Sequence, residues 1–216
     1  NLLTPSIAAA ATEWCRANRM DCAYFLADPT DSETVVQAER WQAHLTDVRV
    51  TLRAGVPANG ASAGCVRRAV SADLAGLQAI ARASHRDGRF FYDGHFEPER
   101  CEAFYETWIT RSLEGFADVL LVPDVDGIAA GYVTCKKEPS TETGRIGLFA
   151  VGEAYRGKGL ARDLIASAMA WFRENGVKVV DVTTQGRNVA AQRLYTNCGF
   201  RPHSMYLWYH KWFSSE

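Results

Sequence analysis

The chain has 216 residues, of which 47% are hydrophobic and 23% are charged, a composition typical of a globular protein. Its 24 basic and 25 acidic side chains nearly cancel, and no block of basic residues occurs, which argues against a nucleic-acid partner. The six cysteines include no C-x-x-C pair and no Cys/His ligand spacing, which predicts reduced thiols, no metal site and a cytoplasmic location. No apolar run approaches the roughly 18 residues of a membrane-spanning helix, so no membrane association is expected.

Residues 1–54 are predicted to form a small, partial α/β unit. The expected elements are a helix at about 4–18, a strand at 22–27, a helix at 32–45 and a strand at 47–54. The alanine-rich start has no basic n-region, which indicates a helix rather than a signal peptide. The first residue is Asn rather than Met, so the sequence leaves open whether the native N-terminus is present. Residues 55–64 are small, turn-rich and uncharged, which predicts a linker.

Residues 65–216 are predicted to form the main domain. The expected elements are a strand at 65–70, a helix at 71–84, a polar-aromatic loop at 85–98, a helix at 99–113, strands at 117–122 and 128–137 joined by a turn, a strand at 144–151, a helix at 158–175, a strand at 177–184, a helix from 188 and a strand at 202–212. The strands just before residue 151 follow one another without helices, which predicts an antiparallel meander leading into a β-loop-α-β unit. The predicted fold class is therefore α/β, with a mixed, mostly antiparallel central sheet flanked by helices.

The stretch VGEAYRGKGLARDL, residues 151–164, fits three phosphate-binding patterns in part. A P-loop would need a hydroxyl for Mg²⁺ where Gly159 stands, although Asp181 on the next predicted strand resembles a Walker-B carboxylate. A dinucleotide fingerprint would need glycine at Arg162 for close helix–strand packing. The spacing R-x-x-G-x-A, from Arg156 to Ala161, matches a coenzyme A pyrophosphate loop without exception.

The position of this loop suits an anion. A predicted strand ends near Val151 and a helix follows, so free amides and the helix dipole favour a phosphate group. Gly157 and Gly159 remove side chains that would block the backbone, while Arg156 and Lys158 add positive charge. An ordinary surface turn remains the alternative.

A second motif, NVAAQRLYTNCGF, runs from Asn188 to Phe200. On a helix, Asn188, Ala191 and Tyr195 share one face, which places an amide, a small residue and a phenol together. Taken alone, Tyr195 is better explained as an amphipathic tyrosine at the edge of the core than as a catalytic residue.

The ordered pair R-x-x-G-x-A and N-x-x-A-x-x-L-Y-x-x-x-G-F resembles the GCN5-related N-acetyltransferase (GNAT) superfamily, over about residues 65–213. The resemblance implies a GNAT fold, acetyl-CoA as co-substrate, no metal, and direct acetyl transfer to a primary amine. The coenzyme-binding residues that it implies are the backbone of Leu148, Phe149, Ala150 and Val151, the amides of Arg156, Gly157, Lys158, Gly159, Leu160 and Ala161, and the side chains of Asn188 and Tyr195.

The resemblance also implies how catalysis would work. Positioning and a strand amide that polarises the thioester carbonyl would supply most of it. Tyr195 would act as the general acid that protonates the departing thiolate. The base that deprotonates the amine is left open among His95, Asp93, Glu97, Glu138 and water.

A narrower likeness extends further along the chain. The segments 22–39, 47–52 and 88–115 resemble the nucleotide-sugar branch of the family, the dTDP-fucosamine acetyltransferases. That likeness implies acetylation of the 4-amino group of a dTDP-linked 4-amino-4,6-dideoxyhexose, and a homodimer. Another amine acceptor and a non-catalytic acyl-CoA sensor stay open.

The loop from His85 to Phe96 is the expected acceptor site. Its arginines could meet a diphosphate and its aromatic rings a sugar or base; the alternative is that these rings anchor the loop on the core. The predicted acceptor-binding residues are Arg89, Phe90, Tyr92 and His95.

Overall fold

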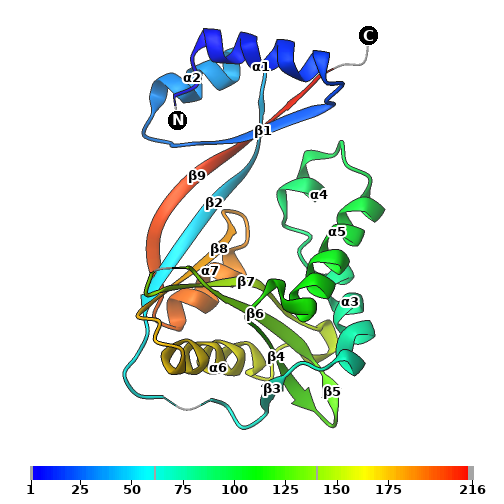
Figure 1. The fold of residues 1–216 in the computed structure, drawn as a ribbon, viewed down its shortest axis with the longest axis vertical. Coiled ribbons are helices and arrows are strands. Elements are labelled where there is room, and N and C mark those ends of the chain that lie inside the picture. The colour runs from blue at the N-terminus through cyan, green and yellow to red at the C-terminus, as the bar shows by residue number, and fades with distance from the viewer. Residues whose placement is uncertain (1, 61, 140, 214–216) are drawn as a thin grey trace.

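The structure is a computed structural model that describes residues 2–60, 62–139 and 141–213. Within these ranges nine strands form one twisted sheet, in the order β1-β9-β2-β8-β7-β6-β4-β3, with β5 paired to β4 (Figure 1). The strands are β1 (Cys22–Ala27), β2 (His44–Gly55), β3 (Val66–Arg68), β4 (Val119–Val125), β5 (Ile128–Ala129), β6 (Gly131–Lys137), β7 (Thr143–Val151), β8 (Val179–Gln185) and β9 (Arg201–Trp212). The α-helices are α1 (Pro5–Ala17), α2 (Ser32–Arg40), α3 (Leu74–Ala83), α4 (Arg89–Asp93), α5 (Pro98–Arg111), α6 (Leu160–Glu174) and α7 (Val189–Asn197).

The predicted mixed α/β sheet is confirmed. Strands β4, β6 and β7 form the antiparallel meander, and β8 then pairs with β7 in parallel after the α6 crossover. Two local predictions are wrong. Helix α2 ends at Arg40 rather than at residue 45, because Gln42 turns the chain with φ +56 and β2 begins at His44 to pair with β9. The expected loop at 85–98 contains helix α4, which Gly94 ends in a left-handed conformation, φ +78.

The N-terminal 54 residues contribute to the same sheet as the rest of the chain. Strand β2 lies between β8 and β9 and is antiparallel to both, while β1 pairs with β9 at the sheet edge. Helices α1 and α2 lie at the end of the molecule where β1 meets β9, and Ala38 of α2 packs there against Ala27 and Tyr209 (Figure 1). The division into a unit at 1–54, a linker at 55–64 and a domain from 65 stays a prediction, and residue 54 falls in a strand shared with the main sheet.

Two hydrophobic clusters cover the central strands. One lies under α6, where Leu164 and Phe172 pack with residues of β6, β7 and β8. The other lies under α3 and α5, where Leu77 and Ile109 meet Tyr132 of β6. The sheet is thus held between α6 on one face and the α3–α5 pair on the other.

The two central parallel strands pair over only part of their length. Strand β7 pairs with β8 from Thr143 to Ile146, opposite Val179 to Val182. Beyond this point β7 continues to Val151 beside β6, and β8 continues beside β2. Because neither strand has the other as a partner there, the sheet opens between them.

At the end of β7 that pairs with β8, the backbone of Gly144 packs closely against the ring of Phe172. A Cβ atom at this position would lie 2.4 Å from the ring of Phe172, which is fully buried in the α6 cluster. We expect Gly144→Ala to lower the free energy of unfolding by about 1–3 kcal/mol, because a buried ring must move to admit the methyl group. Chemical denaturation measures this change. Gly55→Ala in β2 is the matched control, since its Cβ meets nothing within 4 Å; equal stability of the two variants would contradict the packing described here.

Candidate active site

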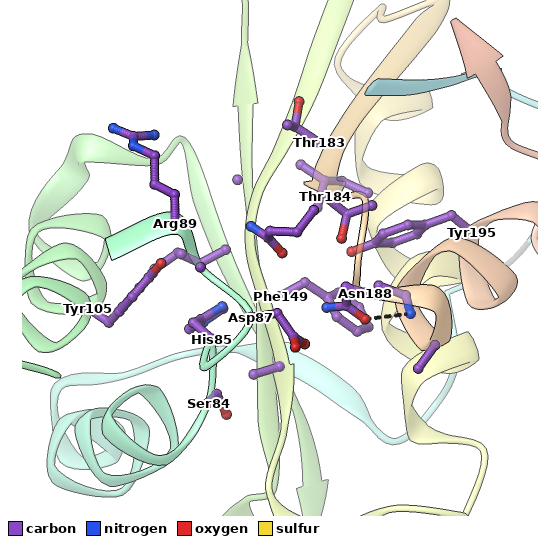
Figure 2. A pocket seen from close by; sticks show the side chains of 18 of the residues that line it. Ser84, His85, Asp87, Arg89, Tyr105, Phe149, Thr183, Thr184, Asn188 and Tyr195 are labelled. Atoms are coloured by element: carbon purple, nitrogen blue, oxygen red, sulfur yellow. Dashed lines mark hydrogen bonds between the residues drawn. The ribbon is translucent and has the colours of Figure 1, made fainter. Parts of the chain in front are cut away.

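A pocket of about 800 Å³ lies where β7 and β8 separate. One wall comes from α5 and the segment that leads into α4, with His85, Asp87, Arg89 and Tyr105. The other comes from β8 and the start of α7, with Thr183, Thr184, Asn188 and Tyr195 (Figure 2). Strand β7 runs between the two walls, so a single pocket connects the coenzyme-binding and acceptor-binding segments that the sequence predicts.

The predicted coenzyme strand forms the floor of this pocket. Leu148, Phe149, Ala150 and Val151 all line it. The Leu148 amide donates to the Thr134 hydroxyl on the β6 side at 2.7 Å, and the Gly152 amide donates to Ala130 on the same side. Because N–H directions alternate along a strand, the amides of Phe149 and Val151 point into the gap left by β8.

The predicted pyrophosphate loop joins this floor to the start of α6. Arg156 and Ala161 line the pocket, and between them Gly157 and Gly159 adopt positive φ angles of 76° and 83°. The remaining predicted loop residues, Lys158 and Leu160, lie between the same two pocket residues without lining the pocket themselves. At the start of α6, the first amides with a hydrogen-bond acceptor are those of Arg162 and Asp163, which donate to the backbone oxygen of Gly159. The earlier amides of this turn carry the positive end of a 15-residue helix.

Asn188 and Tyr195 lie together on the opposite wall, as the helical spacing predicts (Figure 2). The Asn188 side chain caps α7 by accepting the Ala191 amide at 2.9 Å. Only 4% of Tyr195 is exposed, and its ring packs against Phe149 and Phe200. Burial raises the pKa of the Tyr195 phenol, so the hydroxyl stays protonated. A protonated phenol that lines the pocket can serve as a proton donor.

Two of the four predicted acceptor residues lie in the pocket. Arg89 and Phe90 line it, and the Arg89 guanidinium lies 3.9 Å from the centre of the Trp208 ring and 4.3 Å from that of Phe90. Within the part of the chain that the structure describes, the buried Nε of Arg89 has no hydrogen-bond partner. Burial lowers the pKa of Arg89, because the guanidinium is held away from water, and the nearby charge of Asp47 offsets this only in part.

The other two predicted acceptor residues are not brought to the pocket. Tyr92 is exposed, with the Arg187 guanidinium 3.8 Å from its ring centre. His95 donates to the Asp93 carboxylate through Nδ1 at 2.8 Å and stacks on Trp212. Both therefore hold the segment around α4 in place.

The suggested bases lie outside the pocket lining as well. Asp93 is buried and accepts hydrogen bonds from His210, Trp212 and His95. Although burial acts to raise the pKa of Asp93, these hydrogen bonds hold it below its usual value. Glu138 pairs with Arg145 at 2.8 Å, and Glu97 precedes helix α5.

Among the titratable residues that the structure adds to the predicted site residues, His85 and Asp47 could exchange a proton near neutral pH or below. His85, which has a positive φ of 61°, contacts the Tyr132 hydroxyl through Nε2 at 2.8 Å, and burial lowers the pKa of its ring to about 4. Asp47 on β2 is 5% exposed, and burial raises the pKa of its carboxyl to about 6. His85 is the first residue of the loop predicted as the acceptor site, whereas no local pattern marks Asp47, because its place in the pocket comes from the pairing of β2 with the distant strand β9.

Comparison with known proteins identifies the family. The model of the acetyltransferase (GNAT) family matches residues 79–200, more than half of the chain. The solved GCN5-related N-acetyltransferase from Sphaerobacter thermophilus superposes on 96% of this chain and 67% of that one, with a TM-score of 0.70 at 16% identity. This chain belongs to the GNAT acetyltransferase family.

Two curated relatives are more similar in sequence. The spore coat polysaccharide biosynthesis protein SpsD of Bacillus subtilis is 28% identical over 67% of this chain and 49% of its own length. The dTDP-fucosamine acetyltransferase of Escherichia coli O6:H1 is 28% identical over 72% of this chain and 67% of its own length. The chain thus spans about half of the first relative and two thirds of the second.

One further feature concerns membranes. Over residues 2–60, 62–139 and 141–213, none of the helices combines the length and apolarity that crossing a bilayer requires.

The Asp93 network should make stability depend on pH. Because the folded-state pKa of Asp93 is lowered, its stabilisation is present above the unfolded pKa and is lost as pH falls through the folded pKa. We expect Asp93→Asn to lower the free energy of unfolding by about 2–3 kcal/mol at pH 7, since three donors lose a charged acceptor. The difference from wild type should shrink below about pH 4. Denaturation at several pH values measures this, with the exposed Asp87→Asn as control; a pH-independent difference would contradict the network's role.

Proposed function

We propose that the protein is an acetyl-CoA-dependent N-acetyltransferase whose acceptor is the 4-amino group of a dTDP-linked 4-amino-4,6-dideoxyhexose. The observation that carries this proposal is the single pocket that joins the open edge of β7 to a wall of arginines and aromatic rings. The two relatives named above, one a dTDP-fucosamine acetyltransferase and one a polysaccharide biosynthesis protein, support the acceptor class.

The residues at the open edge suit acetyl-CoA. The pantetheine arm can pair with the backbone of Phe149 and the amide of Val151, as an added strand would, while the Val151 carbonyl accepts from Nε of Arg156. The start of α6 offers free amides and glycines without side chains to a pyrophosphate. When bound there, acetyl-CoA supplies an acetyl group activated as a thioester.

The residues of the chain then contribute positioning and charge stabilisation. The Phe149 amide points into the gap between β7 and β8. It would donate a hydrogen bond to the thioester carbonyl oxygen of bound acetyl-CoA. Tyr195 holds its proton and donates it to the leaving sulfur. The narrow gap between β7 and β8 orients both partners of the reaction.

The acceptor half of the pocket suits an anionic ligand. Arg49 and Arg89 both line it, and no carboxylate among the described residues forms an ion pair with either. Burial, together with the nearby charge of Arg145, lowers the pKa of Arg49. A diphosphate would supply the missing negative charge, and the rings of Phe90 and Trp208 would pack against a sugar or base.

The test is the release of CoA thiol from acetyl-CoA with a panel of amines: dTDP-4-amino-4,6-dideoxygalactose, its glucose epimer, free amino sugars and polyamines. We expect rapid release with one nucleotide sugar and little with the amines that carry no phosphate, because only the former satisfies Arg49 and Arg89. Release only with other amines would keep acetyl transfer and reject the nucleotide sugar. Binding of acetyl-CoA without release across the panel would favour a sensor.

Variants at the two ends of the coenzyme site should separate chemistry from binding. Tyr195→Phe is expected to lower kcat by about a hundredfold or more, because the leaving thiolate loses its proton donor. Its protection by acetyl-CoA against thermal unfolding should match wild type, since the ring packing on Phe149 and Phe200 is kept. Gly159→Glu should instead abolish that protection, because a carboxylate and a strained φ enter the anion site. Normal turnover of Tyr195→Phe, or normal protection of Gly159→Glu, would overturn the corresponding role.

A further inference from the structure

The carboxylate of Asp47 lies in the acceptor half of the pocket, and nothing in the mechanism above uses it. Resting on the proposed acetyl transfer, we propose that Asp47 receives the ammonium group of the acceptor and takes its proton, acting as the general base of the reaction.

The backbone of β2 directs Asp47 into the pocket. The pairing of β2 with β9 shifts register between Leu45 and Asp47, so that Thr46 is an extra residue and the strand bulges. Such a bulge changes the direction of the side chain that follows it. Asp47 pairs across the sheet with Trp208, which also lines the pocket, so both side chains face the acceptor site.

The Asp47 carboxylate is buried, but one of its oxygen atoms has no hydrogen-bond partner among the described residues. Asp47 is 5% exposed, and among the described residues its Oδ1 has no hydrogen-bond partner. Its one ion-pair contact is with Nη1 of Arg187 at 3.2 Å, which does not have hydrogen-bond geometry. A buried anion in this state is costly, and an ammonium group in the pocket would supply the donors that it lacks.

The neighbouring charges leave Asp47 basic enough for the role. Burial, with a smaller contribution from Asp87, raises its pKa to about 6, although Arg187, a hydrogen bond from the Val48 amide and Arg89 act to lower it. The carboxylate is therefore ionised at neutral pH and is a stronger base than an ordinary aspartate.

His85 also lines this half of the pocket, but it is a weaker choice of base. Its ring has a pKa of about 4, and its Nε2 is engaged with the Tyr132 hydroxyl. A base with so low a pKa would hold a proton from an ammonium group poorly at neutral pH.

Arg187 holds the arrangement together. Its guanidinium donates to the backbone oxygen of Asp87 at 3.0 Å and to that of Thr46, and it stacks on Tyr92. These three contacts hold the Arg187 guanidinium in an orientation in which it lies beside Asp47 without hydrogen-bonding the carboxylate. Arg187 is in this sense a positioning residue.

In the proposed step, the acceptor nitrogen loses a proton to Asp47 and attacks the acetyl carbon. One N–H bond of the ammonium group breaks and an O–H bond forms on Asp47, which leaves the electron pair on nitrogen. That pair forms the C–N bond to the acetyl carbon, and the C–S bond breaks. The phenolic proton of Tyr195 goes to sulfur, the second amine proton restores the phenol, and Asp47 later releases its proton to water.

The test compares pH profiles of kcat/KM for wild type, Asp47→Asn and Asp181→Asn, using whichever amine of the panel wild type acetylates. Wild type should show an acidic limb near pH 6, where Asp47 becomes protonated. Asp47→Asn should lose about a hundredfold in kcat/KM at pH 7 together with this limb, while acetyl-CoA protects it normally against thermal unfolding. Asp181→Asn is the matched control. Asp181 on β8 is paired with Arg53 on β2, but it lies outside the pocket lining. The Asp181→Asn variant should therefore keep the acidic limb of the pH profile.

A second variant covers the case in which Asp47→Asn does not fold. Because the charge of Arg187 lowers the pKa of Asp47, Arg187→Met should move the acidic limb to higher pH. If the acidic limb is unchanged in Arg187→Met, or persists in Asp47→Asn, then Asp47 is not the general base. Either result would leave the proposed acetyl transfer itself intact. Failure of wild type to acetylate any amine would overturn the proposed function, and the role of Asp47 with it.

Discussion

The separation of β7 from β8 beyond Ile146 is the constraint on which the site depends. Where the two strands stay paired, Gly144 packs against Phe172 and the sheet is closed. Where they part, β7 keeps its partner β6 on one side and presents unpaired backbone groups on the other. An open sheet edge is normally a liability, but here it lies inside a pocket where a ligand can pair with it.

The N-terminal segment completes the pocket that this separation opens. Strand β2 enters the sheet between β8 and β9, and it brings Arg49 and Asp47 to the acceptor side. The α4 segment lies over these two residues. It is held to β9 by the hydrogen bonds of the buried Asp93 with His210 and Trp212. The acceptor wall therefore joins parts of the chain that are more than 150 residues apart, which ties acceptor recognition to the packing of the N-terminal strands.

Local patterns in the sequence were sufficient to place the residues of the proposed coenzyme side around one pocket. The strand–loop–helix from Val151 to Ala161 and the helical face of Asn188 and Tyr195 depend on contacts within a few residues, so spacing alone predicts their place. The acceptor side was less predictable, because Asp47 and Arg187 meet only through strand pairing and through a bulge. Tyr92 and His95 lie in the expected segment, yet helix α4 turns them toward Arg187 and Trp212 instead of the pocket.

One physical cause, burial, prepares Asp47 and Tyr195 for opposite roles. Removal from water disfavours the charged form of any group. For the Tyr195 phenol, this effect strengthens the hold on the proton that the proposed mechanism gives to the leaving thiolate. For the Asp47 carboxyl, the same effect makes the ionised form more basic, as the proposed transfer from an ammonium group requires. In this proposal, the pocket that opens between β7 and β8 holds both a donor and an acceptor of protons, and the charge of Arg187 limits how basic Asp47 becomes.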